Sequence, residues 1–195
     1  MYTGVMPKIW NETITAHRDA VREATIDATA RLVHEHGLTT VTMSQIAKES
    51  GIGRATLYKY FPDLESILVA WHERHVDAHL HQLVEVSERV HEPAERLATV
   101  LRAYATVSRE SRQGGDLASL LHQGDHVVSA QARLHTFLTA LVSQAAERGE
   151  VRDDIPPAEL AAYALHALTA AANAADDAAL DRLVAVTLAG LRNPK

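Results

Sequence analysis

The chain has 195 residues, of which 47% are hydrophobic and 23% charged, a composition that suits a folded protein with a real core and excludes a largely disordered chain. It contains no cysteine, which excludes disulfides and thiol-based metal or redox sites and suits a reducing compartment. The net charge of −6 argues weakly against a nucleic-acid partner. However, residues 1–62 contain seven Lys/Arg and six Asp/Glu, whereas residues 63–195 contain twelve Lys/Arg and nineteen Asp/Glu. The acidity therefore belongs to the second part of the chain.

The sequence has no recognisable secretion signal or membrane span. Residues 1–10 contain no apolar run before a small-residue cleavage site, and no segment reaches the roughly 18 uninterrupted apolar residues that a span requires. The most alanine-rich stretch, residues 158–175, is interrupted by Glu159, His166 and Asn173, so we interpret it as a helix of a globular protein. We therefore expect the protein in the cytoplasm.

The first predicted element is an amphipathic helix over residues 17–36. Its apolar stripe has helical spacing and consists of Val21, Thr25, Ala28 and Leu32. Gly37 follows the last turn, where a left-handed residue commonly ends a helix.

Two short helices are predicted next. The first covers residues 42–50, with Thr42 at the N-cap, Gln45 three residues later as in a capping box, and Met43, Ile46 and Ala47 facing inward. Gly51 allows a tight turn. The second helix covers residues 53–61, with Leu57, Tyr58 and Phe61 available for packing, and Pro62 ends it or opens the next helix.

The rest of the chain is predicted to be a succession of longer helices. Gly and Pro interrupt Ala/Leu/Val-rich segments, which predicts helices over residues 63–90, 94–111, 115–124, 127–148, 157–174 and 177–192. No segment shows sustained period-two alternation, so the fold is predicted to be all-α with about nine helices. We expect an N-terminal helix-turn-helix domain over residues 14–62 and a larger helical domain over residues 63–195.

Residues 42–61 are the part of the sequence with a recognisable chemistry. Two short helices joined by residues 50–52 have the layout of a helix-turn-helix, whose second helix enters the major groove of DNA. Gly53 and Ala55 add little bulk, so this helix can approach closely, and Arg54 can pair with guanine while Thr56 meets a thymine methyl or a phosphate. The alternative is an ordinary helical corner, which many all-α folds contain.

Three runs of residues carry a resemblance to a known family. They are Thr42-Met43-Ser44-Gln45-Ile46-Ala47, Gly51-Ile52-Gly53 and Thr56-Leu57-Tyr58-Lys59-Tyr60-Phe61-Pro62. Together with the helix that ends at Gly37, they closely resemble the DNA-binding domain of the tetracycline-repressor (TetR) family over about residues 16–69. The resemblance implies a homodimer that binds a palindromic operator, usually as a repressor, and releases DNA when a small molecule occupies the C-terminal domain.

The resemblance also implies roles for individual residues. Thr42, Ser44 and Gln45 match phosphate contacts of the first short helix, and Gly53, Arg54, Ala55 and Thr56 match base-facing positions. Tyr58, Lys59 and Tyr60 match contacts that hold the DNA backbone. One departure is that the family often has a lysine after the Phe-Pro pair, where this chain has Asp63-Leu64-Glu65, so we expect a phosphate contact to be absent there.

The last two predicted helices match, by resemblance, those that pair in the family's dimer. Residues 173–177 link them closely, so they should be antiparallel. Their apolar stripes consist of Ala161, Leu165, Leu168 and Ala172, and of Leu180, Leu183, Val184, Val186 and Leu191. These stripes could pack across a dimer, as the resemblance implies, or form the core of a single chain.

The sequence does not identify an effector pocket or a metal site. Candidate pocket residues of the second domain are Trp71, Tyr104, Phe137, Tyr163, Arg102, His122, Gln123, His126, Thr136, Thr139, His166 and Asn173. The twelve histidines include i, i+4 pairs such as His75/His79 and His122/His126, but no nearby Cys and no HExxH pattern, so we expect no metal and no cofactor. The run His72, His75, His79 and His81 is expected on an exposed helix face.

Two other functions remain open at this point. An enzyme is disfavoured because the chain has no GxSxG motif, no Gly-rich phosphate loop and no metal-ligand cluster. A helical adaptor that binds only protein would also suit the long acidic second part. We expect a DNA-binding regulator, with double-stranded DNA, a second copy of the chain and a small-molecule effector as partners, and no membrane partner.

Overall fold

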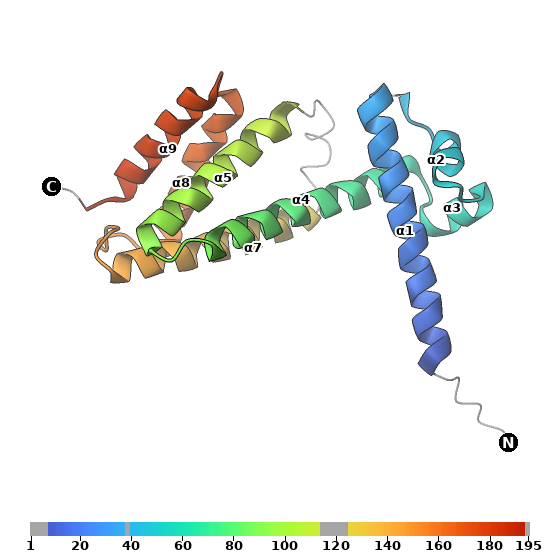
Figure 1. The fold of residues 1–195 in the computed structure, drawn as a ribbon, viewed down its shortest axis with the longest axis horizontal. Coiled ribbons are helices and arrows are strands. Elements are labelled where there is room, and N and C mark those ends of the chain that lie inside the picture. The colour runs from blue at the N-terminus through green and yellow to red at the C-terminus, as the bar shows by residue number, and fades with distance from the viewer. Residues whose placement is uncertain (1–7, 38–39, 114–124, 194–195) are drawn as a thin grey trace. The chain divides into compact units, whose positions relative to one another are not determined.

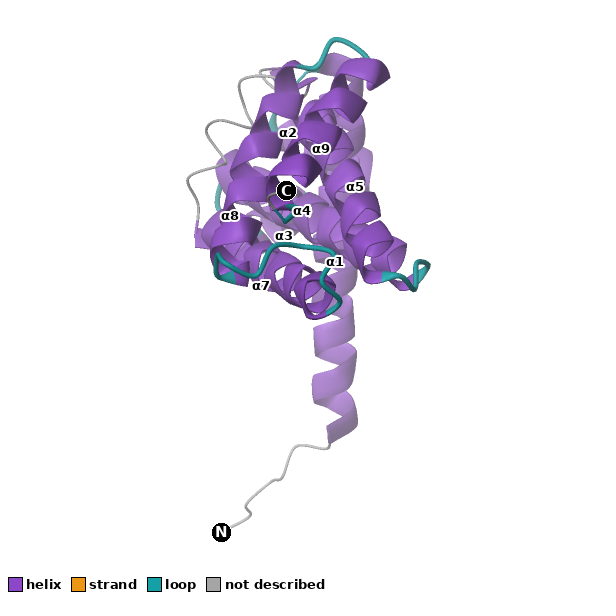
Figure 2. Cartoon of the chain, turned by 90° about the vertical axis from the view of Figure 1, so that its left-hand side faces the viewer, coloured by secondary structure: helices purple, strands orange, loops and turns teal. Residues whose placement is uncertain are grey.

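A computed structural model describes residues 8–37, 40–113 and 125–193. These residues form eight α-helices and one 3-10 helix, and Figure 2 shows no strand among them. The predicted all-α fold of about nine helices is therefore confirmed. In the same ranges, no helix combines the length and the hydrophobicity needed to cross a membrane. Contacts within the chain divide it into two units, Met1–Glu73 and Arg74–Lys195.

The first unit is built from α1 (Lys8–His36), α2 (Met43–Ser50), α3 (Arg54–Tyr60) and the beginning of α4 (Leu64–Glu88). Figure 1 shows α2 and α3 on one side of α1. Its buried core consists of Ile26, Leu32, Val41, Ile46, Ala47, Leu57, Phe61, Ile67 and Ala70. The three-helix arrangement that the sequence predicted is thus held by one small apolar cluster.

The predicted stripe of α1 is confirmed, because Val21, Thr25, Ala28 and Leu32 are all buried. The Thr25 hydroxyl donates to the Val21 carbonyl at 2.8 Å, which satisfies a polar group inside the core. The helix begins at Lys8, nine residues before the predicted start. Apolar periodicity marks only the packed part of a helix, and no Gly or Pro separates Lys8 from the packed part.

Two glycines end helices as predicted. Gly37 has φ 75° and donates its N–H to the Val33 carbonyl at 3.0 Å, and Gly51 has φ 69° and donates to the Lys48 carbonyl. Both are left-handed conformations that glycine adopts without a steric penalty. They turn the chain out of α1 and out of α2.

The second unit contains the rest of α4, α5 (Pro93–Gln113), α7 (Asp125–Glu147), α8 (Pro157–Leu168), the 3-10 helix η2 (Thr169–Asn173) and α9 (Asp177–Leu191). The helix predicted over residues 115–124 lies outside the described residues. The helix predicted over 157–174 is correct in extent, but its last turn tightens into η2, as helix ends often do. The connection from η2 to α9 is only three residues long, and α8 packs against α9.

The apolar stripes of α8 and α9 lie mostly in the core of the single chain. Ala161, Leu168, Leu180, Val184 and Leu191 are buried in the second unit, and Leu165 and Leu183 pack partly buried against them. The interpretation of these stripes as single-chain core is therefore correct for most members. Val186 differs, because 68% of it is exposed.

The expectation for the histidine run of α4 was wrong at one position. His72 is buried, with 7% of its surface exposed, whereas His75 and His81 are exposed. Residues four apart share a helix face, and His72 follows the buried Leu68 by four. His72 therefore belongs to the inner face of α4.

Candidate functional site

The helix α3 has one anchored face and one exposed face. Leu57 and Phe61 are 0% and 2% exposed, one turn apart, and fix the helix to the core of the first unit. Gly53 precedes the helix with φ −58° and accepts the Leu57 N–H at 2.9 Å. The outer face is exposed and consists of Arg54, Ala55, Thr56, Tyr58 and Lys59. These are most of the positions predicted to face bases or the DNA backbone.

The two tyrosines of α3 differ from the prediction in which of them packs against the core. Tyr58 was expected to pack as well as to contact DNA, but 46% of it is exposed and it is not part of the core cluster. Tyr60 packs partly buried against the cluster instead. Tyr60 lies three residues after Leu57 and so falls on the anchored face, whereas Tyr58 is rotated about 100° away from Leu57.

The start of α2 is held by the predicted capping box. The Gln45 N–H donates to the Thr42 hydroxyl at 3.3 Å, and the Thr42 N–H donates to the Gln45 side-chain oxygen at 2.9 Å. The Thr42 hydroxyl also donates to that oxygen at 2.7 Å. Both side chains therefore have a structural role, which leaves the Gln45 amide N–H₂ and the exposed Ser44 hydroxyl available to a phosphate.

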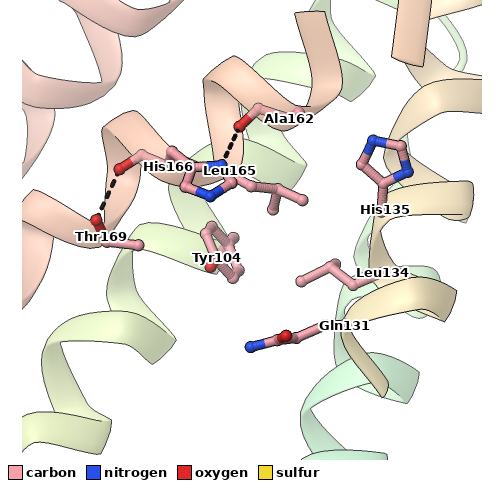
Figure 3. Close-up of a pocket in the computed structure, with 8 residues that line it drawn as sticks. All are labelled: Tyr104, Gln131, Leu134, His135, Ala162, Leu165, His166 and Thr169. Atoms are coloured by element: carbon pink, nitrogen blue, oxygen red, sulfur yellow. Dashed lines mark hydrogen bonds between the residues drawn. The ribbon is translucent and has the colours of Figure 1, made fainter. Parts of the chain in front are cut away.

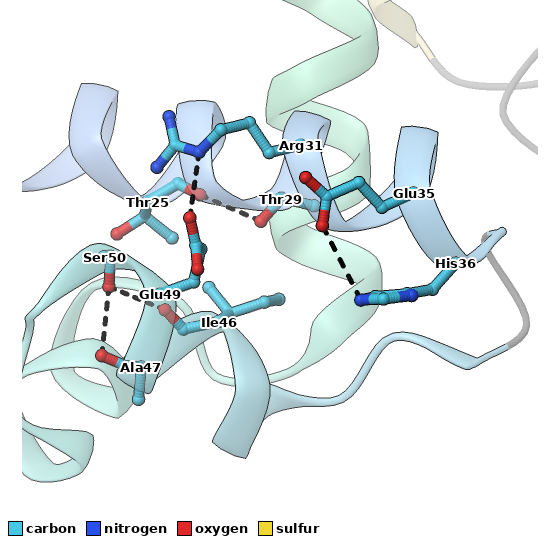
Figure 4. A network of polar contacts seen from close by, with 9 residues as sticks. All are labelled: Thr25, Thr29, Arg31, Glu35, His36, Ile46, Ala47, Glu49 and Ser50. Carbon is cyan, nitrogen blue, oxygen red and sulfur yellow. Dashed lines mark hydrogen bonds and ion pairs between the residues drawn. The ribbon is translucent and has the colours of Figure 1, made fainter.

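Charge on α2 and α3 is positive on the exposed side. Residues 42–61 contain Lys48, Arg54 and Lys59 against the single carboxylate of Glu49, a net charge of +2. Glu49 Oε1 lies 3.0 Å from the Arg31 Nε of α1, in the contacts of Figure 4, so its charge is already paired. For the three cations, the described residues provide no ion-pair partner. The first unit thus presents cations outward although the whole chain is acidic.

A feature that the sequence analysis missed is a notch beside α3. Its lining comes from α1 and the end of α3 and consists of Thr15, Arg18, Asp19, Arg22, Tyr60 and Phe61. The Arg22 guanidinium lies 5.5 Å from the centre of the Phe61 ring and pairs with Glu73 at 3.5 Å. Arg18 is exposed and adds a cation near Tyr60. The spacing of residues along α1 could not predict this notch, because the notch forms only when α3 packs against α1.

The acidic step after Phe61-Pro62 has a structural explanation. The Ser66 N–H donates to the Asp63 carboxylate at 2.8 Å, and the Ser66 hydroxyl donates to the Asp63 carbonyl at 2.7 Å. Asp63 therefore caps the start of α4, where a negative charge also interacts well with the helix dipole. This chain thus has a helix cap at the step where the resemblance would place a lysine.

The second unit contains a cleft of about 220 Å³. It is formed by α5, α7, α8 and η2, and its lining consists of Tyr104, Gln131, Leu134, His135, Ala162, Leu165, His166 and Thr169 (Figure 3). Leu134, Ala162 and Leu165 provide apolar surface, and the other side chains carry polar groups. None of these side chains is an Asp, Glu, Lys or Arg.

Backbone carbonyls fix the ring orientation of both histidines in the cleft. His166 Nδ1 lies 2.7 Å from the Ala162 carbonyl and His135 Nε2 lies 2.9 Å from the Ala158 carbonyl. A carbonyl can only accept a hydrogen bond, so each of these nitrogens carries the proton. Burial raises the pKa of the Tyr104 phenol, with an opposing effect of Ser108, so the phenol stays protonated and can donate.

Two of the predicted pocket candidates, Tyr104 and His166, line this cleft. Arg102 pairs with Asp181 at 2.8 Å instead, and Phe137 packs partly buried against the core. The candidates His122 and Gln123, and the side chain of His126, lie outside the described residues. Gln131, Leu134 and His135 of α7 were not predicted, because their i, i+3, i+4 spacing resembles any other helix stripe until the facing helices are known, and neither was Thr169 of η2.

The histidine pair of α4 forms a ring contact. The rings of His75 and His79 meet edge to face with centroids 4.1 Å apart. Among the described residues, no group of three or more His, Cys, Asp or Glu side chains could hold a metal ion. The pair of His122 and His126 falls outside the side chains that the structure describes.

Both parts of the chain match models of known families. The model described as bacterial regulatory proteins of the tetR family matches residues 26–70, which include α2 and α3. The model described as the C-terminal domain of SbtR-like transcriptional regulators matches residues 92–193, more than half of the chain.

Individual proteins agree with these matches. The HTH-type transcriptional regulator HbdR of Aromatoleum sp. (strain CIB) is 31% identical over 97 residues, which are 50% of this chain and 42% of HbdR. The chain thus matches less than half of the length of this relative. Among solved structures, a TetR/AcrR-family regulator of Thermobifida fusca has a TM-score of 0.72 at 19% identity, covering 88% of this chain and 98% of that one.

A further solved structure has the same fold. It is AibR in complex with isovaleryl coenzyme A and operator DNA, with a TM-score of 0.59 at 19% identity, covering 90% of this chain and 100% of that one. The exposed face of α3, the two family models and the shared fold agree with the resemblance that residues 42–62 carry. The chain belongs to the TetR family of bacterial transcriptional regulators.

Proposed function

We propose that this protein is a ligand-responsive regulator of transcription that binds a palindromic operator as a homodimer, as a repressor and without a cofactor. Because its partner is DNA, it acts in the cytoplasm. The observation that carries the proposal is the outer face of α3, where Arg54 and Lys59 are exposed and unpaired among the described residues while Leu57 and Phe61 hold the helix in place.

In this proposal the residues of α2 and α3 divide into two groups. Arg54 is the base-reading residue, because its guanidinium can donate two parallel hydrogen bonds to guanine, and Gly53, Ala55 and Thr56 allow the close approach that this requires. Phosphate contacts come from the start of α2 and the end of α3. They are Ser44, the Gln45 amide, Tyr58, Lys59 and Tyr60, together with Thr42 when its hydroxyl turns from the Gln45 side-chain oxygen to a phosphate.

Dimerisation is proposed to occur through the outer face of α8 and α9. Val186 of α9 is 68% and Tyr163 of α8 is 45% exposed, which leaves apolar surface that the single chain does not cover. The Tyr163 ring lies over Gly190, where an added Cβ would come 2.6 Å from the Tyr163 oxygen. The absence of a side chain at Gly190 thus leaves room for this ring against α9, which allows close packing of the two helices.

Regulation requires a coupling between the second unit and the spacing of the two recognition helices. These helices must lie about 34–36 Å apart, or a multiple of that distance, to enter successive major grooves. An effector changes DNA affinity only if it binds one dimer geometry better than another. We propose that the effector binds in the cleft of the second unit.

The experiment is a footprint of the full-length protein on DNA upstream of its own gene, repeated at several salt concentrations. A regulator protects a two-fold symmetric site, and its affinity falls steeply as salt rises because phosphate contacts release counterions. The alternative, a helical adaptor that binds only protein, predicts no protected palindrome at any salt concentration. An enzyme makes the same negative prediction.

A further inference from the structure

We propose that the cleft of the second unit takes a small, neutral, ring-sized molecule bearing a hydroxyl group, and that His166 Nε2 accepts the hydrogen of that hydroxyl. The inference rests on the proposed function, since it names the chemical class of the effector. Three features of the cleft support it: its volume, the absence of Asp, Glu, Lys and Arg from its lining, and the hydrogen-bond acceptors that His166 and Thr169 present.

The volume limits the ligand to about one ring with short substituents. An engineered apolar cavity of about 150 Å³ binds benzene, and drug-sized ligands need cavities of roughly 300 Å³ or more. The cleft, at about 220 Å³, lies between these values. Figure 3 shows the Tyr104 ring beside the aliphatic ends of Leu134 and Leu165, so a flat ring would have apolar contacts on two sides.

The lining contains no Asp, Glu, Lys or Arg, which favours a neutral ligand. A charged molecule that enters a partly buried site loses hydration, and only a partner of opposite charge compensates for that loss. No side chain of the lining carries a permanent charge. The Tyr104 phenol also stays neutral, since burial raises its pKa.

On the α8 side of the cleft, the polar groups of His166 and Thr169 can accept hydrogen bonds from a ligand, but their own hydrogens are already donated within the chain. His166 Nδ1 already donates to the Ala162 carbonyl at 2.7 Å, so in the neutral ring Nε2 has a free lone pair. In Figure 3 this second nitrogen points toward the side where Tyr104 lies. The Thr169 hydroxyl donates to the His166 carbonyl at 2.7 Å, which leaves its oxygen as an acceptor too. A ligand that meets this side must supply the donor.

The experiment measures binding to the full-length protein without DNA, by calorimetry. Three probes differ only in the polar group: 4-ethylphenol has a hydroxyl donor, 4-ethylanisole has the methyl ether without a donor, and 4-ethylbenzoate is an anion. We expect the phenol to bind at least about tenfold more tightly than the other two, the factor that corresponds to about one hydrogen bond.

Variants assign the effect to His166. His166→Phe keeps a ring but removes the acceptor, and we expect it to reduce the preference for phenol over ether to about twofold or less. His81→Phe is the matched control. His81 Nδ1 also contacts the backbone carbonyl of the residue four positions earlier, Asp77, at 2.8 Å, but His81 does not line the cleft. Thr169→Val provides a second test that leaves the imidazole in place. Unchanged melting temperatures show that each variant folds.

Equal binding of phenol and ether, tighter binding of the benzoate, or a preference that survives His166→Phe would overturn the inference. No binding of any probe would overturn it as well. Because these measurements contain no DNA, they are independent of the footprint. A protein that binds the phenol but protects no operator would refute the proposed function and leave the assignment of the cleft standing.

Discussion

Single residues on α3 separate into those that hold the helix and those that are free to bind. Leu57 of α3 and Phe61, which directly follows α3, are buried, whereas Arg54 and Lys59 of α3 are exposed cations. The side chains that would touch DNA can therefore be replaced with little effect on the core. This separation allows base recognition and phosphate binding to be tested one residue at a time.

Arg54→Ala and Lys59→Ala are expected to weaken DNA binding in different ways. Loss of a bidentate guanine contact should cost about 1–3 kcal/mol at the operator and relax selectivity at one base position. Loss of a phosphate contact should weaken binding to all sequences alike and reduce the salt slope by about 1. Titrations of operator and scrambled DNA at several salt concentrations measure both. Selectivity that Arg54→Ala leaves intact would contradict the assignment of base reading.

The histidine pair of α4 is expected to make stability depend on pH. Partial burial lowers the pKa of His75 below the ordinary value of 6.5. For His79, burial and the neighbouring His75 charge lower the pKa, whereas Glu110 raises it by a smaller amount. The unfolded chain then binds more protons than the folded chain, so stability is fully present above pH 6.5 and is lost as the pH falls toward the lowered values.

Urea unfolding between about pH 8 and about pH 5 measures this dependence. The double variant His75→Gln/His79→Gln should show a flatter decline in the free energy of unfolding than the unaltered chain. His81→Gln, an exposed histidine on the same helix, is the control and should keep the original slope. A double variant as steep as the unaltered chain would assign the decline to other groups.

At the scale of elements, the helices of the first unit owe their ends to a few local contacts. Gly37 and Gly51 end α1 and α2 in the left-handed conformation, and the capping box of Thr42 and Gln45 begins α2. The helix α2 has only eight residues, too few to be stable in isolation. Its cap and its two buried residues, Ile46 and Ala47, therefore contribute much of what keeps it folded.

Thr42→Ala is expected to lower the free energy of unfolding by about 1 kcal/mol, because it removes the side-chain half of the capping box. Thr42→Ser keeps the hydroxyl and should remain within about 0.5 kcal/mol of the unaltered chain. Chemical denaturation followed by circular dichroism measures both. If the serine variant were as unstable as the alanine variant, the methyl group and not the cap would be the stabilising feature.

At the scale of the whole molecule, the question is which apolar surface remains for a partner. Most of the apolar stripe residues of α8 and α9 are buried in the core of the second unit. Val186 and Val128 stay exposed, by 68% and 63%, on α9 and α7 respectively. The proposed dimer covers the first of these and not the second.

Val186→Arg is therefore expected to weaken the dimer at least tenfold, because a charge would be buried against the second copy. Val128→Arg is the matched control, an equally exposed valine on another helix, and should leave the dimer intact. Analytical ultracentrifugation measures the dissociation constant of each variant. Two variants with the same dissociation constant would place the dimer surface elsewhere.

The sequence by itself determined the helix-turn-helix, because its signals are local. The capping box, the left-handed glycines and the positions of Leu57 and Phe61 depend on residues within a few places of one another, and all were predicted correctly. The start of α1 at Lys8 escaped prediction because apolar periodicity marks only the packed part of a helix, and the burial of His72 escaped it because helical spacing does not say which face of α4 meets a neighbour.

Only the tertiary structure decided which faces meet. The packing of Tyr60 in place of Tyr58, the notch between Arg18 and Tyr60, and the use of the α8 and α9 stripes as single-chain core all depend on the direction from which a neighbouring helix approaches. The cleft depends on three segments that are distant in sequence, namely α5, α7 and the continuous stretch of α8 and η2. Helical spacing defines a stripe on one helix, but the packing partner of that stripe is set by the sum of many weak contacts across the whole chain.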